Sequence, residues 1–233
     1  MNFMIKAILF DLDGTLLNRE ASIQAFIRDQ YERKIKVLGS VEKNRYCTRF
    51  VELDNNGYTW KDQVYQQIVH EYRLDISPEE LLNDYIVFFQ NHCVAFDGLY
   101  ELLYCLKQSG YILGLVSNGK THFQLNNARA LKIEEQFDTI LISEEEGVKK
   151  PDSQIFLRAL NRLNVSPHEA VYVGDHPVND IKGAKNVGIR TIFKKNNQVV
   201  DLEEGVSINR LLDILHIVSE WTRKDRSALL EKE

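Results

Sequence analysis

Aspartates that follow apolar runs are the residues of this sequence best suited to chemistry. Asp11 and Asp13 follow one short apolar run directly, and Asp175 and Asp180 follow another. If the two runs are neighbouring strands, carboxylates meet, and like charges about 4 Å apart repel by roughly 4 kcal/mol at an effective dielectric of about 20. A shared proton or a bound cation would relieve this repulsion. An all-oxygen site with few protein ligands suits Mg²⁺, which is the cofactor we expect.

The same acids have a structural interpretation. An aspartate after a strand is commonly a turn former or a helix cap, and either role would suffice for Asp13 beside Gly14-Thr15. Two acid pairs after two strands are not explained in this way, so the set as a whole favours a functional role.

Polar residues also follow two further apolar runs. Ser117-Asn118-Gly119 follows one of them, and a hydroxyl with backbone N–H groups at a helix start can cradle an anion. Taken alone, this tripeptide is more typical of an ordinary loop. Lys150-Pro151 follows the other run, where a lysine could neutralise phosphate charge, although isolated lysines are usually solvated.

A parallel sheet would bring these residues together. Helical patterns alternate with apolar runs: Leu99, Leu102, Leu103 and Leu106 have helical spacing, and Gly110 is placed to cap that helix. The alternation predicts an α/β fold with a doubly wound parallel (Rossmann-like) sheet. The strands are expected at residues 5–10, 111–116, 139–142, 170–173 and 190–193.

Two further helices are expected in the second half of the chain. Ser166-Pro167-His168-Glu169 has the residues of a helix start, with a capping serine, a first-turn proline and a glutamate at the third helical position. A late amphipathic helix is indicated by Ile208, Leu211, Leu212, Leu215 and Val218.

Residues 17–94 interrupt the alternation. They contain almost no strand-like run, and Ser77-Pro78-Glu79-Glu80 is another helix start. We therefore predict a helical cap domain at residues 17–94, inserted into a catalytic core of residues 1–16 and 95–233. Because ligands of doubly wound sheets bind at the carboxyl ends of the strands, an insert leaving from Leu16 or Leu17 would stand over the site as a lid.

Composition narrows the class of protein. The chain has 233 residues, of which 44% are hydrophobic and 27% charged, as expected of a folded protein with a sizeable core. Its net charge of −5 and the lack of a basic stripe argue against nucleic acid or an anionic membrane as partner. Three cysteines without metal-ligand spacing suggest reduced thiols. The apolar start is too short for a signal peptide or a membrane span, so a cytoplasmic protein is expected. Oligomeric state is not indicated.

Four segments, in this order, resemble the motifs of the haloacid dehalogenase superfamily, a large group dominated by aspartate-nucleophile phosphatases. The first segment is specific on its own, whereas the second and third become specific only when they occur together with the others. The segments that resemble the four motifs are Asp11-Leu12-Asp13-Gly14-Thr15-Leu16, Ser117-Asn118-Gly119, Lys150-Pro151, and Gly174-Asp175 through Asn179-Asp180.

The resemblance implies a catalytic role for each matching residue. Asp11 would attack the phosphorus atom and form an aspartyl-phosphate. Asp13 would protonate the leaving oxygen and then deprotonate the hydrolytic water. Ser117 and Lys150 would hold the phosphoryl oxygens, assisted by the backbone of Asn118 and the following glycine.

The resemblance also implies a metal site. Mg²⁺ would be bound by Asp11, Asp175 and the backbone carbonyl of Asp13. Asp180 would reach the metal through water or orient Lys150. The implied activity is hydrolysis of small phosphomonoesters, with nucleoside monophosphates or sugar phosphates as candidates, since the chain looks nearest to small-cap phosphatases of the pyrimidine 5′-nucleotidase kind.

Alternatives inside the superfamily stay open to different degrees. A dehalogenase would not need Asp13, because a halide takes no proton, and a phosphonate hydrolase would need a Schiff-base lysine in the cap. A phosphomutase is compatible with the motifs. A binding protein that has kept the fold but lost turnover is disfavoured by the intact set of acids.

A competing motif overlaps the second segment. Residues Gly114 to Thr121 satisfy the phosphate-loop pattern G-x-x-x-x-G-K-[ST]. Leu115 and Val116 continue an apolar run, however, which places Gly114 inside a strand and leaves too short a loop to wrap a polyphosphate.

Several other residues could touch substrate, but each has a plainer interpretation. His176 is expected to have a loop role. A solvated helix face is the expected place of four residues of the insert, namely Arg45, Tyr46, Arg49 and Trp60.

Overall fold

A computed structural model of the chain describes residues 4–196 and 205–230, with side chains up to Asp225. It consists of two compact units. One comprises the chain up to Leu17 and from Ala95 onward, and the other is the insert Asn18–Val94. The predicted core also includes residues 1–3, 197–204 and 231–233, which lie outside the described residues.

The core unit is built on a parallel sheet of six strands in the order β3-β2-β1-β4-β5-β6. This confirms the predicted doubly wound fold. All five predicted strands are present, whereas β6 was not predicted. The strands are β1 (Ala7–Phe10), β2 (Ile112–Ser117), β3 (Thr139–Ile142), β4 (Ala170–Gly174), β5 (Arg190–Lys194) and β6 (Val206–Ile208).

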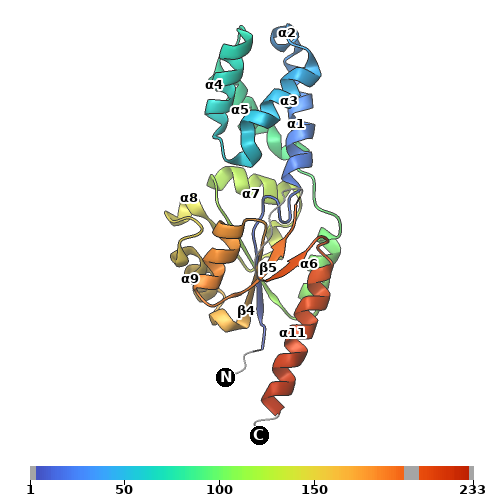
Figure 1. The fold of residues 1–233 in the computed structure, drawn as a ribbon, viewed down its shortest axis with the longest axis vertical. Helices are drawn as coiled ribbons and strands as arrows, with labels where there is room; N and C mark the ends of the chain where they lie inside the picture. Colours follow the sequence, from blue (N-terminus) through green and yellow to red (C-terminus); the bar gives the residue numbers. More distant parts are fainter. Residues whose placement is uncertain (1–3, 197–204, 231–233) are drawn as a thin grey trace. The chain divides into compact units, whose positions relative to one another are not determined.

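The central strands are apolar throughout because helices cover both faces of the sheet. Every residue of β1 and β4 is buried. Ala7 and Leu9 share one core cluster with Phe156 of α9 (Ser153–Arg162). On the other side of the sheet, Figure 1 shows α6 (Leu99–Gln108) beside α11 (Asp213–Leu230). The remaining core helices are α7 (Thr121–Ala130), α8 (Ser143–Glu146) and α10 (Gly183–Asn186).

One predicted helix is absent and another, α11, is present but begins later than predicted, and both errors arise where strand pairing overrides a local helical pattern. The capping contacts of Ser166 form, since its backbone N–H donates to Glu169 over 2.9 Å, but only one 3₁₀ turn (Pro167–Glu169) precedes β4. The late helix begins at Asp213, because Ile208 is buried in β6 and its carbonyl accepts from Lys195 of the chain following β5 over 2.8 Å. Edge pairing of this kind leaves no signal in helical periodicity.

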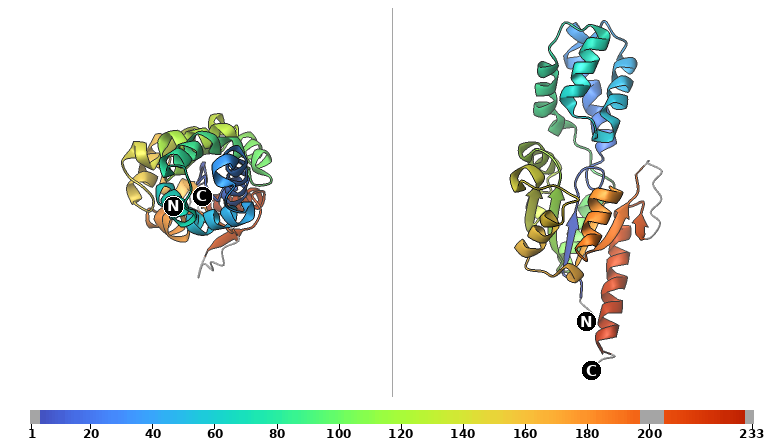
Figure 2. Two further views of the ribbon diagram at one scale, coloured as in Figure 1. Left: turned by 90° about the horizontal axis from the view of Figure 1, so that it is seen from above. Right: turned by 60° about the vertical axis from the view of Figure 1, so that its left-hand side comes forward.

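The insert unit is helical, and Figure 2 shows its helices as a bundle. Ser77 caps the last of them as predicted, accepting from the backbone N–H of Glu80 over 3.1 Å. Tyr46 is not on a solvated face: it is fully buried, and its hydroxyl lies 3.3 Å from Gln30 Oε1. The helices are α1 (Arg19–Arg33), α2 (Ile35–Leu38), α3 (Lys43–Asp54), α4 (Lys61–Tyr72) and α5 (Pro78–Phe88).

A buried ionic cluster joins α1, α3 and α4 within the insert. Asp54 accepts from both terminal nitrogens of Arg19, over 2.8 and 2.9 Å, and also pairs with Lys61. Burial acts to raise the pKa of Asp54, but Arg19 and Lys61 outweigh burial and hold that pKa below its usual 3.8. The carboxylate therefore stabilises the folded insert in its ionised form.

We expect Asp54→Ala to destabilise the insert by about 3 kcal/mol, because two largely buried cations lose their counter-ion. The measurement is urea or thermal denaturation, with Asp75→Ala, a change of an exposed insert acid, as control. Because the pKa is lower in the folded state, the contribution is present above pH 3.8 and is lost as the pH falls through the folded value. If the difference in the free energy of unfolding between variant and wild type stayed constant below pH 3.8, Asp54 would not contribute through its ionised form.

No helix in the described ranges is both long and apolar enough to cross a membrane. The three cysteines, all of them within the described residues, form no disulfide, and Cys47 is buried in the insert.

Candidate active site

The site lies at the carboxyl ends of β1, β2 and β4. These strands are neighbours, with β1 in the middle, so the residues that follow them meet at one edge of the sheet. Asp11 comes immediately after β1, and its backbone N–H still donates to Val173 of β4 over 2.9 Å. Ser117 is the last residue of β2, and Asp175 follows the last residue of β4.

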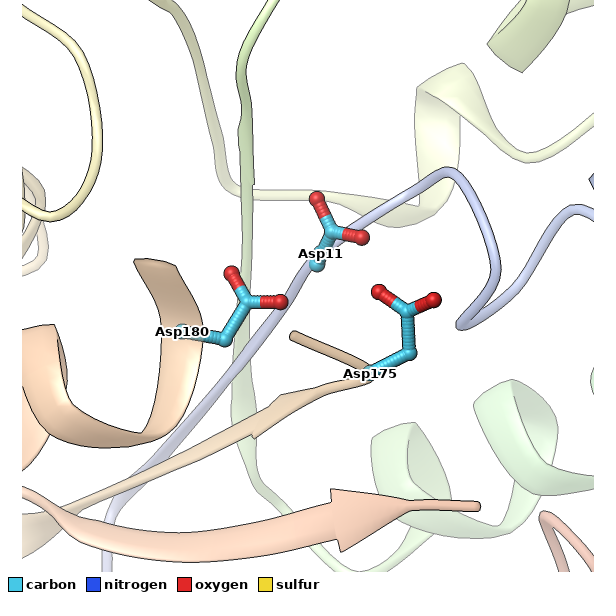
Figure 3. Close-up of side chains that lie close together, drawn as sticks. All are labelled: Asp11, Asp175 and Asp180. Atoms are coloured by element: carbon cyan, nitrogen blue, oxygen red, sulfur yellow. The ribbon is translucent and has the colours of Figure 1, made fainter. Parts of the chain in front are cut away.

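Three carboxylates converge there. Asp11, Asp175 and Asp180 each offer an oxygen, and these oxygens lie within 4.8 Å of one another. Figure 3 shows their carboxylates turned toward a common space. Asp180 comes from a π-helical turn (Pro177–Lys182) that follows β4, and it is 1% exposed. The expected approach of Asp11 to Asp175 therefore takes place, and Asp180 joins them.

A single buried lysine contacts two of these acids. Lys150 Nζ lies 2.6 Å from Asp11 Oδ1 and 2.7 Å from Asp180 Oδ1. It also donates to the hydroxyl of Tyr172 over 3.0 Å. The backbone of Lys150 is held on both sides by the side chain of Asn118, which donates to its carbonyl over 3.0 Å and accepts from its N–H over 2.9 Å.

Burial and mutual repulsion dominate the electrostatics of the cluster. Burial raises the pKa of Asp11 to about 7, although Lys150 lowers it, and Asp180 raises it further. Burial, with the charges of Asp11 and Asp180, raises the pKa of Asp175 well above its usual value. Burial acts to lower the pKa of Lys150, but the two acids raise it well above its usual value, so the lysine is protonated.

The three carboxylates and the ammonium group of Lys150 together carry an excess of negative charge. A divalent cation with oxygen ligands would balance that excess, so the donor set fits the metal expected from the sequence. The described part of the chain contains no other comparable group of potential ligands.

Asp13 is not one of the three clustered carboxylates. Its Oδ2 accepts from the side-chain amide of Gln124 over 2.5 Å. The next residue, Gly14, has φ +80°, and a Cβ there would lie 2.0 Å from Asp175 Oδ2, so only glycine fits. Asn196 fixes this corner by donating to the Gly14 carbonyl over 2.9 Å and to Asp175 Oδ2 over 2.8 Å.

The Ser117-Asn118-Gly119 segment is well ordered by internal contacts. Ser117 is 1% exposed, and its Oγ accepts from Gln124 over 3.0 Å. The N–H of Gly119 donates to Ser143 Oγ over 2.9 Å. Because β2 pairs with β1 and Leu115 lies opposite Phe10, this segment and Asp11 follow neighbouring strands, and Asn118 binds the loop of Lys150.

Three residues of this site have no counterpart in the sequence predictions, and a fourth was predicted without a role. Tyr172 sits within an apolar strand, and Gln124 resembles any polar residue on a helix, so neither has a distinctive pattern. Asn196 follows β5, where no motif was expected. Thr15 belongs to the first predicted motif but was given no role there, and its hydroxyl donates to Asp11 Oδ2 over 3.3 Å.

The phosphate-loop interpretation is excluded by strand pairing. Gly114 lies inside β2 and is paired with Leu9 and Thr139. Lys120, which such a loop would need for phosphate, instead pairs with Glu144 over 2.7 Å. His176 has the expected loop role, since its Nδ1 accepts from the backbone N–H groups of Val178 and Asn179, both over 3.0 Å.

Comparison with known proteins gives a consistent picture. A family model described as haloacid dehalogenase-like hydrolase matches residues 8–194. A glyceraldehyde 3-phosphate phosphatase from Pyrococcus furiosus is 30% identical over 205 residues, which cover 85% of this chain and 84% of that protein. A pyrophosphatase PpaX from Bacillus cereus is 27% identical over 232 residues, which cover 94% of this chain and 99% of that protein. A solved HAD phosphatase from Thermococcus onnurineus is 28% identical with a TM-score of 0.66, covering 92% of this chain and 98% of that one.

The chain therefore belongs to the haloacid dehalogenase-like hydrolase family. The superfamily and the phosphatase class predicted from the sequence are confirmed. The finer likeness to pyrimidine 5′-nucleotidases stays a prediction.

We expect Lys150→Met to destabilise the metal-free protein by about 3–5 kcal/mol, because Asp11 and Asp180 lose the cation buried between them. Lys149→Met is the matched control, since that neighbouring lysine is exposed. The measurement is urea denaturation of both variants in the presence of a chelator. Equal stability of the Lys150 and Lys149 variants would show that the buried pair does not contribute as described.

Proposed function

We propose that this chain is a magnesium-dependent phosphatase that hydrolyses small phosphomonoesters through an aspartyl-phosphate on Asp11. The observation that carries the proposal is the convergence of Asp11, Asp175 and Asp180 after neighbouring strands, with Lys150 paired to Asp11 and to Asp180. Such a site combines a nucleophile, a fixed cation and metal ligands within one small volume.

Asp11 has the surroundings of a nucleophile. One of its oxygens is bound by Lys150 and the other accepts from Thr15, so its orientation is fixed before substrate arrives. In the first step, an Asp11 oxygen forms a bond to phosphorus while the bond to the leaving oxygen breaks, and Asp13 supplies that oxygen with a proton. In the second step Asp13 takes a proton from water, which attacks the phosphorus, releases phosphate and restores Asp11.

Lys150 supports both steps by position and charge. Its Nζ lies 2.6 Å from the nucleophile, so a phosphoryl group on Asp11 would lie within its reach. Positive charge held in place at this point favours the negative charge that phosphoryl transfer distributes over the equatorial oxygens. Ser117 would assist from the end of β2.

Asp11, Asp175 and the backbone carbonyl of Asp13 would hold Mg²⁺. When bound, the metal supplies positive charge to the transferring phosphoryl group. For Asp180 the contacts favour an orienting role, since one of its oxygens pairs with Lys150 and the other accepts from the His176 N–H over 3.0 Å.

The insert would act as the cap that selects the substrate, with residues 1–16 and 95–233 as the catalytic core. Relatives named as a glyceraldehyde 3-phosphate phosphatase and a pyrophosphatase favour small phosphorylated compounds as substrates. Nucleoside monophosphates and sugar phosphates belong to the same class, and a panel of phosphorylated metabolites would rank them. A phosphomutase of the same fold would be recognised in that panel by transfer of phosphate to a second sugar hydroxyl.

Asp11→Asn is expected to lower turnover of a generic aryl phosphate by at least about a thousandfold, because the amide is not a competent nucleophile. Circular dichroism checks that the fold is retained, and Asp75→Asn controls for loss of an exposed carboxylate elsewhere. Undiminished turnover in the Asp11 variant would refute the assignment.

Chelation of divalent cations is expected to abolish turnover, and added Mg²⁺ should restore it. Asp175→Asn should weaken Mg²⁺ binding by about tenfold or more, measured by calorimetry independently of activity. Full activity in excess EDTA would contradict the metal site.

A further inference from the structure

Beneath the site, one side-chain amide contacts three polar groups. Gln124 Nε2 lies 2.5 Å from Asp13 Oδ2, 3.0 Å from Ser117 Oγ and 3.0 Å from the Asn118 carbonyl. Gln124 is on the inward face of α7 and is 4% exposed. A buried polar side chain with this many partners has a defined orientation.

The orientation of this amide is set by a second residue of α7. Asn127, one turn later and fully buried, donates from its Nδ2 to Gln124 Oε1 over 3.2 Å. A flipped amide would place its oxygen against the Asp13 carboxylate and the Asn118 carbonyl, where oxygen meets oxygen. The contacts of Asn127 and Asp13 thus agree on one arrangement, with the N–H groups toward Asp13.

The amide has two N–H groups for its three acceptors. Asp13 is the charged acceptor and the nearest, so it takes one N–H, and Ser117 and the Asn118 carbonyl share the other. Space for the amide depends on Gly119, which has φ +147°, since a Cβ at that position would lie 2.9 Å from Gln124 Nε2.

We propose that Gln124 is a positioning residue for the proton transfers of Asp13. The inference rests on the proposed function, in which Asp13 is the acid and base. By binding Oδ2, Gln124 leaves Oδ1 as the oxygen that carries the proton. That proton passes to the leaving oxygen as its bond to phosphorus breaks, and in the second step Oδ1 takes a proton from water. Gln124 itself is unchanged throughout.

A positioning role can be told apart from a structural one by varying the leaving group. An alkyl phosphate needs a proton on its departing oxygen, whereas a dinitrophenyl phosphate releases a stable phenolate without one. The parameter kcat/KM covers the steps up to departure of the leaving group, so it reports this first proton transfer. Loss of proton delivery must therefore affect the alkyl substrate selectively.

The test is Gln124→Met, which keeps the length of the side chain and removes the amide. We expect kcat/KM for the alkyl phosphate to fall by about 10- to 100-fold, because a hydrogen bond to a charged group is lost. For the dinitrophenyl phosphate, kcat/KM should change little. Gln108→Met, the same change at an exposed position, should leave both unchanged. An equal loss with both substrates would overturn the inference.

Two further variants complete the design. Asn127→Leu keeps Gln124 but removes the donor that orients it, so a smaller loss selective for the alkyl substrate is expected even if the Gln124 variant folds poorly. Asp13→Ala separates the acid role of Asp13 from the positioning role of Gln124. If Asp13→Ala shows the selective loss but Gln124→Met and Asn127→Leu do not, only the inference on Gln124 fails. If Asp13→Ala shows no selectivity, the acid role of Asp13 fails, and the inference with it.

Discussion

The interaction on which this site depends is the contact of Lys150 with Asp11 and Asp180. The lysine and both acids are almost fully buried, and an isolated charge in such surroundings would be strongly destabilising. Together they compensate one another, because the ammonium group forms ion pairs with both carboxylates, at 2.6 and 2.7 Å. Asp175 adds a third negative charge, which makes the cluster suited to a divalent cation.

The fold supplies this interaction by bringing distant parts of the chain together. Asp11 and Lys150 are 139 residues apart. Asp11 follows β1, whereas Lys150 comes after β3, and β2 lies between these two strands. Asn118 follows the intervening strand and binds the backbone of Lys150: its side-chain nitrogen donates to the Lys150 carbonyl, and its side-chain oxygen accepts from the Lys150 N–H. A residue that looked like part of an anion loop thus has a second role, as a clamp between two loops.

The sequence predicted those features that have a local signature. Apolar runs identified five of the six described strands, all except the edge strand β6, and the acids after two of them identified the site. Prediction failed where a contact distant in sequence decides the outcome: Ile208 pairs with the chain after β5 instead of starting a helix, and Tyr46 is buried by packing within the insert. Gln124 and Asn196 were missed because a polar residue on a helix or loop acquires its meaning only from the acid it contacts.

The proposed mechanism requires that Asp11 becomes covalently phosphorylated during turnover. Rapid acid quenching during turnover of an aryl phosphate with Mg²⁺, followed by peptide mass spectrometry, tests it directly. The peptide containing residues 7–16 is expected to gain the mass of one phosphoryl group, located on Asp11, and this adduct should be absent without substrate. A phosphoryl group located on another residue, or turnover without any phosphorylated peptide under conditions that preserve acyl phosphates, would contradict it.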